Sequence, residues 1–147
     1  FQPIALLLAL RNFEKGSIGL FVSGTERQVS SVSQIWMVLA GVMPDKKNRE
    51  LCKRVLEKKA GIPLVTPYMY HYMTEALLQC GMKAEAVDLI KNYWGGMIRD
   101  GADTYWEVCN LKYPDFSPYG STILNSYRHG WSCAPTYFIR KYFQRRK

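Results

Sequence analysis

Apolar residues recur at intervals of three and four positions along most of the chain, which is the spacing of one face of an α-helix. The first clear case runs from Gln28 to Leu39. Gly41 and Pro44 follow it and are expected to end the helix. The apolar face of this predicted helix consists of Val29, Val32, Ile35, Trp36 and Leu39.

A second helix is expected to begin at Asp45, with that side chain as its N-terminal cap and with lysines facing outward. Thr66 followed by Pro67 is typical of another helix start. The apolar stripe of the second helix is Leu51, Cys52, Val55 and Leu56. Further helical segments are predicted over Leu6–Asn12, Tyr68–Gln79, Lys83–Ile98 and from Ala134 through Phe143.

Two stretches lack the helical period. Residues 16–24 are expected to form a loop around the apolar piece Ile18–Val22, and residues 101–132 form a much longer loop. A loop of that length in a compact domain is usually functional or disordered, and its aromatic content favours a function. No convincing strand alternation occurs elsewhere. The expected fold class is therefore all-α, with short links that favour antiparallel helix hairpins.

The composition fits one folded domain. The chain has 147 residues, of which 48% are hydrophobic and 22% are charged. Its net charge of +8 is scattered, with concentrations on one helix face and in a basic tail, so we interpret it as mostly solubilising and expect no nucleic-acid partner. The apolar run Ile4–Leu10 is too short to span a bilayer, so we expect no membrane partner.

The chain begins with Phe-Gln-Pro and no methionine, so we interpret it as a fragment of a longer protein, and we expect its first apolar run to be a helix remnant and not a secretory leader. Four cysteines show no zinc-ligand spacing, and neither a metal nor another cofactor is expected. Reduced thiols and disulfides both stay open as interpretations. The four cysteines are Cys52, Cys80, Cys109 and Cys133.

Candidate chemistry gathers in two motifs, WGGMIRDGADTYWE at residues 94–107 and RHGWSCAP at residues 128–135. They combine glycines, which allow close approach to the backbone, with indole rings, a carboxylate and an imidazole. An apolar wall beside an ionisable oxygen pair suits a sugar. Ordinary core packing is the alternative for such aromatic residues, and we favour it for Trp36 and Tyr68.

Four segments, SGTERQVSSVSQ, TPYMYHYMTEALLQCG, WGGMIRDGADTYWE and SYRHGWSCAPTYF, together resemble the catalytic domain of bacterial α-L-rhamnosidases, the inverting glycosidases of glycoside hydrolase family 78. The resemblance runs from about Leu10 to Phe138. It implies that residues 1–147 form the C-terminal portion of an (α/α)6 barrel of six helix hairpins. The helices lining the sugar pocket would be Gln28–Leu39, Tyr68–Gln79 and Pro135–Tyr142.

The resemblance also implies roles for four residues and a carbohydrate partner that ends in rhamnose or a similar sugar. Glu107 would be the general base that activates water in an inverting hydrolysis. His129 would contact sugar hydroxyls, because imidazole can donate or accept. Trp106 and Trp131 would wall the pocket, with core packing as an equal alternative.

The chain departs from the family's pattern at Asp103 and Arg128, and nothing in it matches the upstream segment that carries the family's general acid. The isolated chain is therefore expected to be inactive, with the remainder of a parent chain as its partner. Two other interpretations stay open. Thr66–Thr104 resembles one helical repeat of an RNA-binding module, although no second copy follows, and the piece could be a non-catalytic remnant.

Overall fold

The computed structural model of this chain describes residues 19–110, 112–113 and 115–144. Within this part, helices account for the regular structure, there is no strand, and two isolated β-bridges join Ser23 to Gln28 and Ser30 to Ile62. The predicted all-α class is confirmed. The helix end predicted at Leu6–Asn12 lies outside the described residues.

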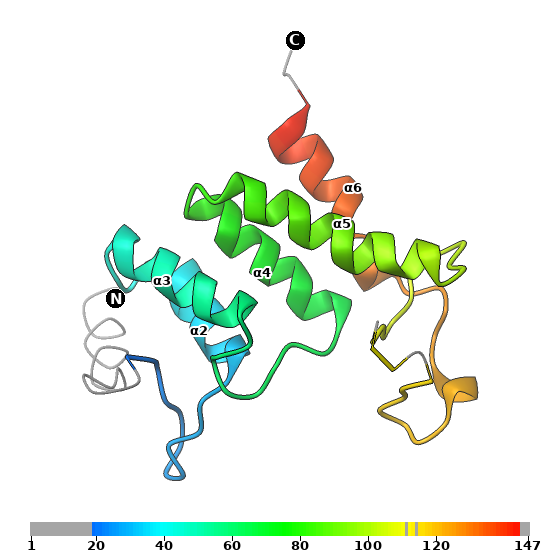
Figure 1. The fold of residues 1–147 in the computed structure, drawn as a ribbon, viewed down its shortest axis with the longest axis horizontal. Helices are drawn as coiled ribbons and strands as arrows, with labels where there is room; N and C mark the ends of the chain where they lie inside the picture. Colours follow the sequence, from blue (N-terminus) through cyan, green and yellow to red (C-terminus); the bar gives the residue numbers. More distant parts are fainter. Residues whose placement is uncertain (1–18, 111, 114, 145–147) are drawn as a thin grey trace. The chain divides into compact units, whose positions relative to one another are not determined.

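The helices lie close to the predicted positions (Figure 1). The contact pattern divides the chain into one unit of residues 1–64 and 75–83 and another of residues 65–74 and 84–147, which we describe separately. Helix α4 contributes residues to both units. The elements are α2 (Ser31–Leu39), α3 (Asp45–Leu56), α4 (Pro67–Gln79), α5 (Lys83–Arg99), the 3-10 turns η1 (Thr122–Leu124) and η2 (Gly130–Ser132), α6 (Ala134–Phe138) and a π-helical segment, η3 (Ile139–Phe143).

Helix α2 begins where the side chain of Ser30 accepts a hydrogen bond from the Ser33 amide at 3.1 Å. Its inward face differs from the predicted one, because Gln34 is buried. The side-chain oxygen of Gln34 accepts a hydrogen bond from the Phe21 N–H, and the side-chain nitrogen of Gln34 donates to the Phe21 carbonyl, both at 2.8 Å. This pairing turns Trp36 outward to 42% exposure, so the core interpretation of Trp36 is wrong. The residues of α2 that are buried are Ser31, Gln34, Ile35 and Val38.

Helix α3 packs against α2 and buries Leu51, Cys52 and Val55, which belong to the predicted stripe. The predicted cap is wrong. Pro44 holds the cap position, its carbonyl accepts from two amides of the first turn, and no side chain caps the helix. Asp45 is the first helical residue, where its negative charge still interacts favourably with the positive end of the helix dipole.

The second unit is built around aromatic contacts between helices. The rings of Tyr70 and Tyr93 stack with centroids 3.7 Å apart. The ring centroid of His71 lies 4.9 Å from that of Phe138, which is fully buried. Tyr68 is 38% exposed, so its predicted place in the core is wrong. Its ring lies instead 5.2 Å from that of Trp131, on a side of α4 that faces outward.

Candidate functional site

The two motifs that carry the candidate chemistry lie side by side in the second unit. The Glu107 amide donates to the Ser126 carbonyl at 2.8 Å, and the His129 amide donates to the Tyr105 carbonyl at 2.7 Å. The two segments therefore run in opposite directions against each other. This backbone pairing places Glu107 and His129 on neighbouring extended segments, neither of which is a regular β-strand.

A buried serine holds the paired segments to the helical body of the unit. The Ser132 hydroxyl donates to the Trp106 carbonyl at 2.7 Å, and the indole N–H of Trp94 on α5 donates to the Ser132 carbonyl at 2.9 Å. Ser132 is only 1% exposed and Trp94 only 3%. One residue thus connects the segment before Glu107, the turn after His129 and helix α5.

Both carboxylate oxygens of Glu107 accept hydrogen bonds. The hydroxyl of Tyr119 donates to Oε1 at 2.7 Å, and the amide of Ser126 donates to Oε2 at 3.1 Å. The Tyr119 hydrogen bond lowers the pKa of Glu107 most, the hydrogen bond from the Ser126 amide adds to the effect, and the neighbouring His129 makes a smaller electrostatic contribution. Glu107 is half-buried, so the carboxylate stays in contact with solvent while it is held ionised.

The other predicted residues divide between two aromatic contacts. The ring of Trp106 meets that of Tyr127 edge to face at 5.5 Å. The ring of Trp131, which is 69% exposed, lies 5.2 Å from Tyr68 and 6.4 Å from His129. The structure therefore brings His129 and Trp131 together next to the Glu107 segment, whereas Trp106 packs on Tyr127.

Sequence reasoning missed the groups that orient Glu107. Tyr119 lies in the long loop twelve residues after Glu107, and Ser126 lies nineteen residues after it. The available signal was the aromatic content of a loop that is too long to be a simple connection. A Tyr-Gly pair with Gly120 at φ 78° marks the turn that carries the tyrosine.

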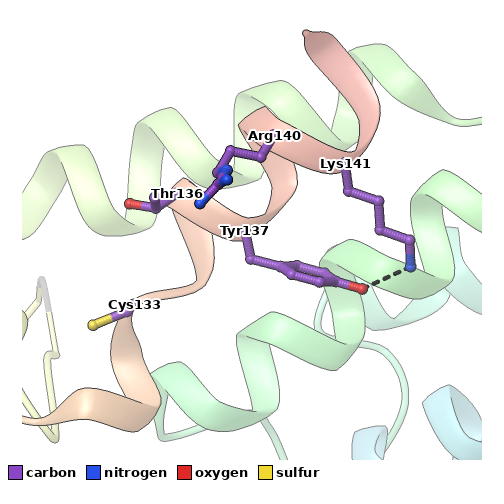
Figure 2. A pocket seen from close by; sticks show the side chains of 5 residues that line it. All are labelled: Cys133, Thr136, Tyr137, Arg140 and Lys141. Carbon is purple, nitrogen blue, oxygen red and sulfur yellow. Dashed lines mark hydrogen bonds between the residues drawn. The ribbon is translucent and has the colours of Figure 1, made fainter. Parts of the chain in front are cut away.

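An open pocket occurs elsewhere in the second unit, around the start of α6 and the following π-helical segment (Figure 2). Figure 2 shows the Lys141 ammonium donating to the Tyr137 hydroxyl, a bond of 2.6 Å. None of the four predicted site residues lines this pocket. Its lining residues are Cys133, Thr136, Tyr137, Arg140 and Lys141.

The described residues contain no group of three or more His, Cys, Asp or Glu side chains placed to hold a metal ion. The four cysteines are free thiols, and Cys133 is the exposed one. In the part of the chain that the structure describes, no helix is both long and apolar enough to cross a membrane.

The described helices are consistent with a partial fold of helix hairpins. The chain is similar to a rhamnosidase from Klebsiella oxytoca, solved with rhamnose bound, at 47% sequence identity and a TM-score of 0.87. The match covers 93% of this chain and 27% of that protein, so this chain spans about a quarter of its length. The chain is therefore similar in sequence and fold to a portion of that rhamnosidase, which agrees with the resemblance of its motifs.

A second similar structure is a family 78 rhamnosidase of Bacillus sp. GL1, with 22% identity, a TM-score of 0.75, and coverage of 92% of this chain and 15% of that one. At this identity the likeness supports the fold alone, and it agrees with the predicted partial (α/α)6 barrel. These matches do not favour the RNA-binding helical repeat. Neither the protein-family models nor the curated proteins gave a match.

Proposed function

We propose that this chain supplies the general base and part of the sugar pocket of an inverting glycoside hydrolase, within a longer protein that removes terminal α-L-rhamnose or a similar sugar. One observation carries the proposal. The Glu107 carboxylate accepts hydrogen bonds from two donors, which lower its pKa, in a chain 47% identical to the matching portion of a rhamnosidase solved with rhamnose bound.

The geometry of Glu107 supports the role of water-activating base. A carboxylate offers about four lone-pair sites, so these two hydrogen bonds leave one site on each oxygen for a water molecule. The lowered pKa keeps the group deprotonated, and therefore able to accept a proton, down to a lower pH than an ordinary glutamate. The water oxygen would attack the anomeric carbon as its proton passes to Glu107.

An inverting hydrolase also needs a carboxylic acid that protonates the leaving oxygen, roughly 6.5–9.5 Å from the base. We propose that this acid belongs to the remainder of the longer protein. Protonation of the leaving oxygen and attack by water from the opposite face then give a product of inverted anomeric configuration. The 147-residue chain alone is expected not to hydrolyse aryl α-L-rhamnosides.

Recognition of the sugar is assigned to His129 and Trp131. The imidazole can donate to one hydroxyl and accept from another, and the exposed indole offers an apolar face to the C–H side of a sugar ring. Trp106, which packs on Tyr127, would support the segment that carries Glu107 and contribute to the wall of the pocket.

The test is Glu107→Gln in the longer enzyme, with an aryl α-L-rhamnoside as substrate. Amide replacement keeps the shape of the side chain and removes its basicity, so turnover should fall on the order of a hundredfold to ten-thousandfold. Glu26→Gln is the matched control, because Glu26 is exposed and lies in the other unit. Turnover of Glu107→Gln close to that of the control would contradict the proposal.

A further inference from the structure

We infer that Tyr119 is a positioning residue that fixes the orientation of the Glu107 carboxylate. The Tyr119 hydroxyl lies 2.7 Å from Oε1, a normal length for a hydroxyl that donates to an anionic oxygen. The catalytic consequence of this bond rests on the proposed function, whereas the bond itself does not.

Two donors reach Glu107 from different parts of the chain, one at each oxygen. The Ser126 amide belongs to the paired backbone segments, and its partner atom is Oε2. Tyr119 reaches Oε1 from the loop between the two segments. A single donor would let the carboxylate swing about one hydrogen bond, whereas two donors on separate oxygens define the direction of its plane.

The loop that carries Tyr119 is itself braced. The Tyr119 amide donates to the Ser117 hydroxyl oxygen at 3.1 Å, and the Ser117 hydroxyl bonds to the side-chain oxygen of Asn125 at 2.8 Å. The Asn125 side-chain nitrogen donates to the Phe116 carbonyl at 3.3 Å. Because Asn125 directly precedes Ser126, both donors to Glu107 are connected through one local network.

The electrostatics of the pair agree with this geometry. The Tyr119 hydrogen bond is the largest cause of the lowered pKa of Glu107, and the same bond is the largest cause of the raised pKa of Tyr119. His129 makes a smaller electrostatic contribution to the lowered pKa of Glu107. Tyr119 is 52% exposed, so water competes for the bond and we expect its main effect to be orientation.

The sign of the pH effect follows from the lowered pKa. A carboxylate with a depressed pKa stays ionised as the pH falls below the ordinary glutamate value, and protonates only when the pH passes its own lower pKa. Tyr119→Phe removes the hydrogen bond that lowers the pKa most, so the pKa of Glu107 should rise. In the longer enzyme, the acid limb of kcat should move upward with it.

The experiment titrates the carboxyl carbon of Glu107 by NMR in this chain and in two variants. Tyr119→Phe should raise the titration midpoint toward that of an ordinary glutamate. Tyr113→Phe is the matched control, since Tyr113 is in the same loop and is 58% exposed, and its midpoint should stay at the original value. Equal midpoints in all three proteins would overturn the inference.

Kinetics in the longer enzyme separate the inference from the proposed function. Tyr119→Phe should lower kcat on the order of tenfold with little change in KM, because it loosens the base without removing it. An unchanged kcat and acid limb, alongside inactive Glu107→Gln, would refute the role of Tyr119 and leave the proposed function standing. An active Glu107→Gln would refute the proposed function, and the NMR titration would still decide whether Tyr119 holds the carboxylate.

Discussion

Replacing Ser132 by alanine should loosen the junction that joins the two motifs. The substitution removes the 2.7 Å bond from the hydroxyl to the Trp106 carbonyl and leaves the bond from the Trp94 indole to the Ser132 carbonyl intact. A hydrogen bond is worth about 0.5–1.5 kcal/mol net, and an acceptor left unpaired inside the protein costs about 1–3 kcal/mol. Because Ser132 is 1% exposed, we expect the free energy of unfolding to fall by about 1–2 kcal/mol.

Urea unfolding followed by tryptophan fluorescence measures this loss. In a Trp36→Phe background, the remaining indoles of Trp94, Trp106 and Trp131 all report on the second unit. With a slope of about 2 kcal/mol per molar urea, the midpoint should fall by about 0.5–1 M. Ser121→Ala is the control, since Ser121 is exposed and its side chain makes no capping bond. If Ser132→Ala and Ser121→Ala unfold at the same urea concentration, the proposed junction is refuted.

Two further predictions concern the fold and the thiols. Gly61→Ala should lower the free energy of unfolding of the first unit by about 3 kcal/mol or more, because the φ of Gly61 is +69° and a Cβ there would lie 2.1 Å from the Val29 carbonyl oxygen. The control Gly24→Ala should cost only about 1 kcal/mol, because Gly24 has a similar φ of +70° but no atom within 4 Å of the added Cβ. Equal losses of stability in urea unfolding would contradict this prediction. Iodoacetamide should label Cys133 in the native chain, as judged by peptide mass spectrometry, because it is exposed, while burial raises the pKa of Cys52, Cys80 and Cys109 and keeps them as unreactive thiols. Native labelling of Cys109 at the same rate as Cys133 would count against the described burial.

The helices could be predicted from the sequence because their signals are local. Three-and-four spacing located α2 to α5, and the Thr66–Pro67 pair located the start of α4. The details that failed depend on contacts distant in the sequence. Gln34 is polar, and only its pairing with the backbone of Phe21, thirteen residues earlier, explains why it is buried while Trp36 is exposed.

The site shows the same division. The proximity of Glu107 and His129 was expected from the family resemblance, since no periodic pattern connects residues 107 and 129. The partners of Glu107 could not be expected, because an irregular loop brings Tyr119 and Ser126 back to it. Irregular backbone leaves no repeating signal in the sequence, so such partners become visible only in three dimensions.

The most direct measurement of the central claim is a proton NMR time course of hydrolysis by the longer enzyme to which we propose that this chain belongs. If Glu107 activates water on the face opposite the leaving group, the first sugar released from an α-L-rhamnoside should be the β anomer, before mutarotation mixes the two. The α anomer as the first product would contradict the assignment of Glu107 as the water-activating base.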